Sequence, residues 1–317
     1  MPNKITLREI LTNSDKCFLV PCVYDCASAR AVEMCGFPVM LLSGGEVSIA
    51  MNGVIDYGFT GLTDLEWMVS RIAQTASIPL IADIEDGFGG PLAVYRAARR
   101  LANAGAAAIQ LEDAGDMENS TRLLPRDPYY AKIRAAVEAV KGTQCLLICR
   151  TNADPDIPEE FEEGCIRMRE SMEMGADMAM IVKVGTYDQA KFMAARVPGW
   201  KIFADVRADN GVPTVTMEQL TDLGFNCAST HYTLKAAMEG MLEHGLANYR
   251  DQSVAYTFTH APATGIASYS ATPLFDPQGY MELEASFTKQ DKEYTIVGHK
   301  VEAFPGGFVR SKVKDRL

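Results

Sequence analysis

The chain has 317 residues, of which 48% are hydrophobic and 22% charged, a composition typical of a globular protein with a sizeable core. A formal net charge of −11 and a pI near 4.9 disfavour binding to nucleic acid or to anionic membrane surfaces, and they favour small molecules as partners. There is no apolar signal core at the N-terminus and no apolar run of bilayer length. The eight cysteines include no C-x-x-C pair. We therefore expect a cytoplasmic protein with reduced thiols.

Eight short apolar or β-branched runs alternate with amphipathic stretches along the chain. Between the runs lie helical patterns such as "PLAVYRAARRLANAG" (91–105), which has apolar spacing near 3.6 and a Gly suited to a C-cap. Eight strand-plus-helix units predict an α/β fold of the (β/α)₈ TIM-barrel type. No G-x-G-x-x-G follows the first run, which argues against a dinucleotide-binding fold. The runs cover residues 17–25, 38–44, 78–85, 106–113, 145–153, 176–184, 201–207 and 225–231.

The alternation stops after residue 250, where aromatic residues mix with Pro and Gly breaks. We therefore divide the chain into a barrel catalytic domain (1–250) and a C-terminal extension (251–317). The extension is expected to pack on the barrel or on a neighbouring subunit.

Polar residues follow almost every predicted strand, at the end of the barrel where active sites lie. Three acidic positions on adjacent strands, Asp83, Glu85 and Glu112, would repel one another unless a cation sat between them. Oxygen ligands favour a hard cation, with Mg²⁺ the best fit and Mn²⁺ the alternative. The other strand-end groups are Ser43-Gly44-Gly45, Asp113, Arg150-Thr151-Asn152, Lys183, Asp205, Arg207 and His231.

Each of these groups also has a purely structural interpretation. A single carboxylate after a strand often caps the next helix, and Asp86-Gly87 suits a turn. Arg150 can form an ion pair with Glu112 or clamp a substrate carboxylate. His231 can be a core histidine or a proton carrier. Ser43-Gly44-Gly45 can be a plain turn or an anion-binding loop.

Four motifs in order resemble the isocitrate lyase / phosphoenolpyruvate mutase superfamily. "VPCVYDCASARAVEMCGFPVMLLSGG" resembles its P-G-x-Y-D-x-x-S-A-R opening, followed by G-F and S-G. "ADIEDGFGG" is similar to its D-x-D-x-G-[YF]-G metal motif, "AGAAAIQLED" to A-G-x-x-G-x-x-x-E-D, and "ICRTNAD" to A-R-T-D-A. The resemblance covers roughly residues 18–245. It implies a Mg²⁺-dependent barrel, usually a homotetramer with exchanged C-terminal helices, acting on C–C or P–C bonds beside a 2-oxo acid.

The resemblance also implies roles for individual residues. Asp83 would bind the metal directly, and Glu85 and Glu112 largely through water. The implied catalytic residues are Tyr24, Arg150 and His231. Tyr24 would hydrogen-bond at the reacting end of the substrate, Arg150 would bind the carboxylate or the developing enolate oxygen, and His231 lies where some members carry a histidine after strand 8. The implied substrate-binding residues are Ser43, Gly44, Gly45, Asp56, Asn119 and Arg150.

Departures from the family's patterns narrow the activity. The lid motif K-[KR]-C-G-H of isocitrate and methylisocitrate lyases is replaced by "LEDAGDMENSTRLLPRDPYY", which has neither Cys nor His. "MENS" keeps Asn119 and Ser120 of the phosphoenolpyruvate mutase lid but places Glu118 where a cation would meet a phosphoryl group. Asn152 replaces the Asp of A-R-T-D-A.

These departures favour a lyase acting on a small 2-oxo or 2-hydroxy dicarboxylate through a metal-stabilised enolate, with oxaloacetate decarboxylation as the most specific hypothesis, because decarboxylation needs no lid acid. A phosphoenolpyruvate mutase or phosphonopyruvate hydrolase, a methylisocitrate lyase-like enzyme and a noncatalytic 2-oxo-acid binder are the alternatives. We expect the chain to form a dimer or tetramer.

Overall fold

The computed structural model describes residues 5–114, 123–209, 211–260, 271–288, 295–296 and 299–300. The chain forms two compact units. One comprises residues 1–33 and 37–235, and the other comprises residues 34–36 and 236–317.

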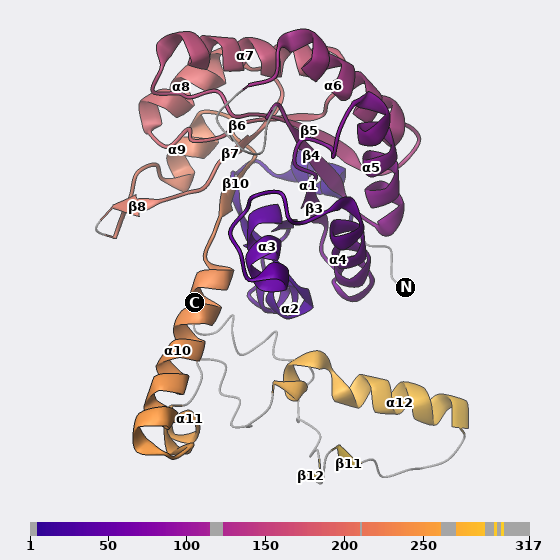
Figure 1. The fold of residues 1–317 in the computed structure, drawn as a ribbon, viewed down its shortest axis with the longest axis vertical. Helices are drawn as coiled ribbons and strands as arrows, with labels where there is room; N and C mark the ends of the chain where they lie inside the picture. Colours follow the sequence, from indigo (N-terminus) through magenta and orange to yellow (C-terminus); the bar gives the residue numbers. More distant parts are fainter. Residues whose placement is uncertain are drawn as a thin grey trace. The chain divides into compact units, whose positions relative to one another are not determined.

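The first unit contains a closed barrel of eight parallel strands in the order β1-β10-β7-β6-β5-β4-β3-β2 (Figure 1). The predicted (β/α)₈ fold is therefore confirmed, and each of the eight apolar runs coincides with one strand. Only β7 begins ahead of its run, by one residue. The strands are β1 (Phe18–Val23), β2 (Met40–Leu42), β3 (Leu80–Asp83), β4 (Ala108–Glu112), β5 (Leu146–Thr151), β6 (Met178–Ile181), β7 (Trp200–Phe203) and β10 (Cys227–Thr230).

Helices connect the strands on the outside of the barrel, as βαβ units require (Figure 1). The helix predicted within 91–105 is confirmed, because α5 starts at Pro91 and its C-cap Gly105 has a left-handed φ of 108°. A short hairpin of β8 (Ala208–Asp209) and β9 (Val212–Pro213) follows β7. The helices are α1 (Leu7–Asn13), α2 (Cys26–Met34), α3 (Gly44–Asn52), α4 (Leu62–Thr75), α5 (Pro91–Ala104), α6 (Arg126–Val140), α7 (Pro158–Glu173), α8 (Tyr187–Arg196) and α9 (Met217–Asp222).

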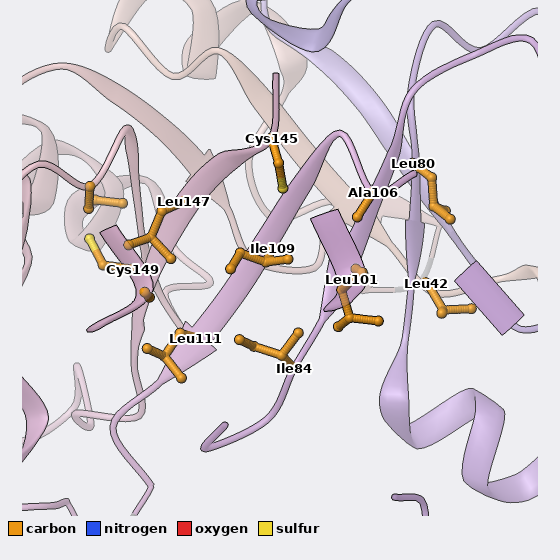
Figure 2. Packing of buried hydrophobic residues seen from close by; sticks show 14 of the residues in the cluster. Leu42, Leu80, Ile84, Leu101, Ala106, Ile109, Leu111, Cys145, Leu147 and Cys149 are labelled. Atoms are coloured by element: carbon orange, nitrogen blue, oxygen red, sulfur yellow. The ribbon is translucent and has the colours of Figure 1, made fainter. Parts of the chain in front are cut away.

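Two hydrophobic clusters lie on opposite faces of the barrel strands, one on the outer face and one on the inner face. The outer cluster joins strand residues such as Ile109 and Leu111 to helix residues such as Leu101, and Figure 2 shows these side chains close together. The inner cluster contains the alternate strand residues, for example Ile81 and Ile148, together with Leu7 and Leu11 of α1. Strand alternation thus sends one set of side chains to the helices and the other into the barrel.

The remaining described elements lie largely in the second unit. Helix α10 (Thr233–Asp251) begins in the first unit and continues into the second. It is followed by α11 (Ala255–Thr259), the 3₁₀ turn η2 (Thr272–Phe275), α12 (Pro277–Thr288) and a pairing of β11 (Thr295–Ile296) with β12 (His299–Lys300). Among the helices of the described ranges, none has the length and apolar character needed to cross a membrane.

Candidate active site

Strand alternation decides which strand-end side chains face one another. Ile81 and Ile148 belong to the inner cluster, so Asp83 and Arg150, two positions further along β3 and β5, also point into the barrel. Glu112 of β4 is paired in register with Arg150. These three residues therefore meet at the C-terminal end of the barrel, where the sequence predicts that the acids Asp83 and Glu112 converge.

The guanidinium of Arg150 bridges two of the acids. Its Nη1 lies 3.0 Å from Oδ2 of Asp83, and its Nη2 lies 2.9 Å from Oε2 of Glu112. Both carboxylates are buried, and Nε of Arg150 is a buried atom without a hydrogen-bond partner in the described part of the chain. The ion pair considered from sequence is thus present and extends to a second acid. Because a guanidinium carries five N–H donors, it keeps donors for a ligand.

Glu85 approaches the same region from a strained backbone position. Its φ is 50°, a left-handed value that is uncommon for a residue with a side chain. Its carboxylate lies against Gly44, where an added Cβ would stand only 1.8 Å from Oε1 of Glu85. A side chain at position 44 would therefore displace this carboxylate from its present place.

A further acid, Asp56 from the loop after α3, lies next to Gly45. A Cβ at Gly45 would lie 3.4 Å from Oδ2 of Asp56. Although the residue as a whole is exposed, desolvation of its carboxyl and the charge of Glu112 raise the pKa of Asp56, while Arg150 opposes them. Asp56 thus belongs electrostatically to the same acidic cluster.

The acidic cluster holds more negative charge than its one guanidinium can balance. Burial raises the pKa of Asp83, and Glu112 adds to this effect while Arg150 opposes it. Burial and then Asp83, Asp56 and Glu112 raise the pKa of Glu85 well above its ordinary value. A bound cation would relieve this repulsion.

A hard metal ion requires oxygen ligands, and the side chains of the acidic cluster carry them. In the residues described, no three His, Cys, Asp or Glu side chains are arranged to ligate one ion together. Arg150 lies between Asp83 and Glu112, and Glu85 rests on Gly44. The cluster instead fits a cation such as Mg²⁺, which keeps several waters and needs only one or two direct carboxylates. The assignment of Asp83, Glu85 and Glu112 to a metal stays a prediction.

Ser43 and Tyr24 lie at the ends of β2 and β1. Ser43 is the N-cap of α3, and its Oγ accepts a hydrogen bond of 3.3 Å from the amide of Glu46. The amides of Gly44 and Gly45 follow in the first turn, where a helix favours anions. Tyr24 is half-buried, and burial followed by the charges of Asp25 and Glu46 raises its pKa.

His231, directly after β10, has both ring nitrogens near protein groups. Its Nδ1 lies 3.4 Å from Oε1 of Glu46, and its Nε2 lies 3.4 Å from Sγ of Cys22. Thr233 donates to the carbonyl oxygen of Cys22 at 2.7 Å, with Oε2 of Glu46 at 3.3 Å. Sequence reasoning missed Cys22 and Glu46, because a thiol in an apolar run and an acid in a helix's first turn both have ordinary structural explanations.

Asp113, next to Glu112, faces away from the acidic cluster. It accepts hydrogen bonds from Oγ1 of Thr151 at 2.6 Å and from the amide of Asn152 at 2.9 Å, and it pairs with Nη1 of Arg167 at 3.1 Å. Arg167 also donates to the carbonyl oxygen of Leu124 at 2.7 Å. This buried network fixes the end of β5 beside Arg150.

Three further strand-end residues have local partners. Lys183, with a left-handed φ of 68°, pairs with Asp154 at 3.2 Å, and Arg207 pairs with Asp205 at 3.0 Å. The predicted substrate residue Asn119 lies outside the described residues.

Comparison with known proteins supports the resemblance found in the sequence. The family model of phosphoenolpyruvate phosphomutase matches residues 7–248. The petal death protein of Dianthus caryophyllus is 34% identical over 215 residues, with 66% of each chain covered. An oxaloacetate decarboxylase of Pseudomonas putida (strain GB-1) is 33% identical over 195 residues, 60% of this chain and 66% of that protein. A 2-methylisocitrate lyase of Aeropyrum pernix is 31% identical, with 70% and 71% covered.

Solved structures share the fold over most of the chain. Oxaloacetate acetylhydrolase in complex with 3,3-difluorooxalacetate has a TM-score of 0.78 and 26% identity, covering 90% of this chain and 97% of that one. 2,3-Dimethylmalate lyase has a TM-score of 0.77 and 26% identity, covering 89% and 97%. Phosphonopyruvate hydrolase in complex with oxalate and Mg²⁺ has a TM-score of 0.76 and 25% identity, covering 91% and 100%. The first two curated relatives are matched over slightly less than two thirds of their own length.

Proposed function

Since the chain belongs to the phosphoenolpyruvate phosphomutase family, we propose that it is a Mg²⁺-dependent carbon–carbon lyase acting on a small 2-oxo or 2-hydroxy dicarboxylate. Oxaloacetate is the leading substrate and decarboxylation the leading reaction. Relatives and structural neighbours include an oxaloacetate decarboxylase and an enzyme bound to a difluorinated oxaloacetate, and both names point to a C4 2-oxo diacid.

The observation that carries the proposal is the acidic cluster around Arg150 at the barrel mouth. Asp83 and Glu112 hold the guanidinium by separate nitrogens, while Glu85 and Asp56 add uncompensated negative charge. A divalent cation held by Asp83, with Glu85 and Glu112 contributing through water, would supply the positive charge that stabilises an enolate. Magnesium is the proposed metal, with manganese as the alternative.

The chain's own residues then have separate tasks. The amides of Gly44 and Gly45, at the N-terminus of α3, would receive the substrate carboxylate, with Ser43 fixing the turn. The free donors of Arg150 would meet an oxygen that gains charge as CO₂ leaves. Tyr24 would hydrogen-bond at the reacting end, and His231 would handle a proton. Asn119 remains a predicted contact.

Two other activities keep support from particular observations. The family match itself carries the name of a phosphomutase, and phosphonopyruvate hydrolase is among the structural neighbours, so P–C bond chemistry is the second candidate. The 2-methylisocitrate lyase relative supports a methylisocitrate lyase-like C–C cleavage as the third. A noncatalytic 2-oxo-acid binder would share the site and form no product.

The test is pyruvate formation from oxaloacetate in the presence of Mg²⁺, coupled to lactate dehydrogenase. The Asp83→Ala protein at equal concentration subtracts decarboxylation by free metal. We expect wild-type turnover at least about 100-fold above this control, because the direct metal carboxylate is lost in the variant. Equal rates would reject oxaloacetate as substrate. Phosphonopyruvate and 2-hydroxy diacids would then be assayed in the same pair of proteins.

We also propose a homo-oligomer, dimer or tetramer, and a cytoplasmic location. The first rests on the exposed apolar faces of the C-terminal helices and the second on the composition, with its eight cysteines and acidic charge.

A further inference from the structure

His231, which would handle a proton in the proposed function, contacts two residues that have no role there, Cys22 and Glu46. Oε1 of Glu46 lies on the Nδ1 side of the imidazole and Sγ of Cys22 on its Nε2 side, each at 3.4 Å. Cys22 is fully buried and Glu46 is buried, whereas the His231 side chain is 41% exposed. The ring is therefore held from two sides, with part of it open to solvent.

The three groups come from separate elements, which makes the arrangement a property of the fold. Cys22 lies on β1, Glu46 in the first turn of α3, and His231 after β10. Thr233 connects them, because its hydroxyl proton goes to the carbonyl oxygen of Cys22 at 2.7 Å and its oxygen lies 3.3 Å from Glu46. Cys22 also stands where the quoted family pattern P-G-x-Y-D has glycine, so the contact to His231 is specific to chains with this side chain.

The surrounding charges determine where the proton of these three groups resides. The hydrogen bond to Glu46 raises the pKa of His231 and the charge of Asp205 adds to this, while burial and Arg150 oppose. Burial and then Glu46, Asp205 and Asp83 raise the pKa of the Cys22 thiol well above its ordinary value, with Arg150 opposing. The thiol therefore stays protonated and neutral, and the imidazole is the group that changes charge.

The two nitrogens of a protonated His231 are held unequally. Nδ1–H faces a carboxylate, a strong charge-assisted acceptor. Nε2–H faces a neutral sulfur, which is a weak hydrogen-bond acceptor. Replacing this contact by one to a stronger acceptor on the substrate therefore costs little free energy. The proton on Nε2 is thus the transferable one.

Building on the proposed function, we propose that Glu46 and Cys22 are positioning residues that present His231 as the general acid for an enolate. The proton on Nε2 passes to C3 of the pyruvate enolate. The electron pair of the enolate C=C bond forms the new C–H bond, and the enolate oxygen becomes the ketone oxygen. Neutral His231 keeps Nδ1–H toward Glu46 and regains a proton at Nε2 from solvent. This supplies the acid that a lid without cysteine or histidine lacks.

The first measurement is an NMR titration of protein labelled with ¹⁵N-histidine, carried out without substrate. The chain has four histidines, so His231→Asn identifies the His231 signal by its loss. We expect Glu46→Gln to lower the pKa of His231 by about one pH unit, and Glu46→Asp to restore most of it. Glu33→Gln, which removes a carboxylate on α2 that pairs with Arg30, is the matched control and should leave the titration unchanged.

The second measurement is exchange of the pyruvate methyl protons in D₂O, which is the reverse of enolate protonation and requires no decarboxylation. Exchange begins when neutral His231 removes a methyl proton, so the His231 pKa sets the acid limb of the pH profile. We expect Glu46→Gln to slow exchange about tenfold and to move this acid limb down by the same interval as the His231 pKa. Cys22→Ala should slow exchange severalfold. Cys227→Ala, another buried thiol of the inner cluster, should not.

The outcomes separate this inference from the proposed function. Exchange by wild type without oxaloacetate turnover would reject the substrate and keep the role of His231. A His231 pKa that does not respond to Glu46→Gln, or an acid limb of the exchange profile that stays in place while the pKa moves, would overturn the inference. Absence of both exchange and turnover in wild type would overturn it as well.

Discussion

At the scale of single residues, the acidic cluster lowers the stability of the fold and also supplies the ligands for a cation. Like charges that are buried together oppose folding, yet they are the ligands that bind a hard cation. Asp83 and Glu85 carry most of this conflict, because their pKa values are raised above the ordinary 3.8 and 4.5 while Arg150 compensates only in part. Stability should therefore depend on both pH and metal.

The direction of that dependence follows from proton linkage. Because the folded pKa values of Asp83 and Glu85 are raised, the folded chain holds more protons than the unfolded chain between the ordinary and the raised values. The free energy of unfolding then falls as pH rises through this window. A divalent cation that binds the ionised cluster offsets the loss. We expect Mg²⁺ to raise the melting temperature more at about pH 8 than at about pH 5.

Differential scanning fluorimetry with Mg²⁺, Mn²⁺ or EDTA measures this effect. Glu85→Gln should flatten the pH dependence without metal and reduce the gain from Mg²⁺. Glu159→Gln, in the exposed first turn of α7, serves as the control. An equal gain from Mg²⁺ at both pH values would argue against the assignment of the metal to this cluster.

At the scale of elements, α7 holds the end of β5 in place through Arg167. This residue is 5% exposed, pairs with the fully buried Asp113 and also contacts Glu163 at 2.8 Å. Removing one partner of a buried pair leaves an uncompensated charge, so Arg167→Met should cost about 3–5 kcal/mol of unfolding free energy. Arg134→Met, on the exposed face of α6, should cost less than about 0.5 kcal/mol. Chemical denaturation of both variants measures the difference.

The double variant Asp113→Asn with Arg167→Met distinguishes two causes of the stability loss in Arg167→Met, an uncompensated buried charge and lost packing. If charge is the cause, the double variant should recover part of the stability that Arg167→Met loses. A double variant no more stable than Arg167→Met would show that packing of the arginine side chain dominates.

The positions of the strands could be predicted from the sequence, whereas the direction of individual side chains at the site could not. The strands were readable because buried parallel strands form apolar runs, and barrel topology then brings residues such as Asp83, Glu112 and Arg150 together. The direction of each side chain was harder to read. Glu112 and Asp113 are adjacent, yet one faces the cluster and the other Arg167. Glu46 was missed since its partner His231 is 185 positions away, a contact that no local pattern encodes.

At the scale of the whole molecule, the C-terminal helices expose apolar side chains that a lone chain would leave in water. On α12, Tyr280, Leu283 and Phe287 follow the spacing of one helical face and are 68%, 51% and 76% exposed. Exposed apolar stripes of this kind mark protein interfaces. They support the proposed homo-oligomer, either a dimer or a tetramer.

We therefore expect the chain to sediment as a multiple of 34.6 kDa, either a dimer or a tetramer. Leu283→Glu combined with Phe287→Glu should shift the mass toward the monomer, because association would bury two new charges without partners. Glu282→Gln, on the same helix, should leave the mass unchanged. Sedimentation velocity across a concentration series gives the readout. A wild-type monomer at all concentrations would contradict the oligomer, while an oligomer unaffected by the double variant would place the interface away from α12.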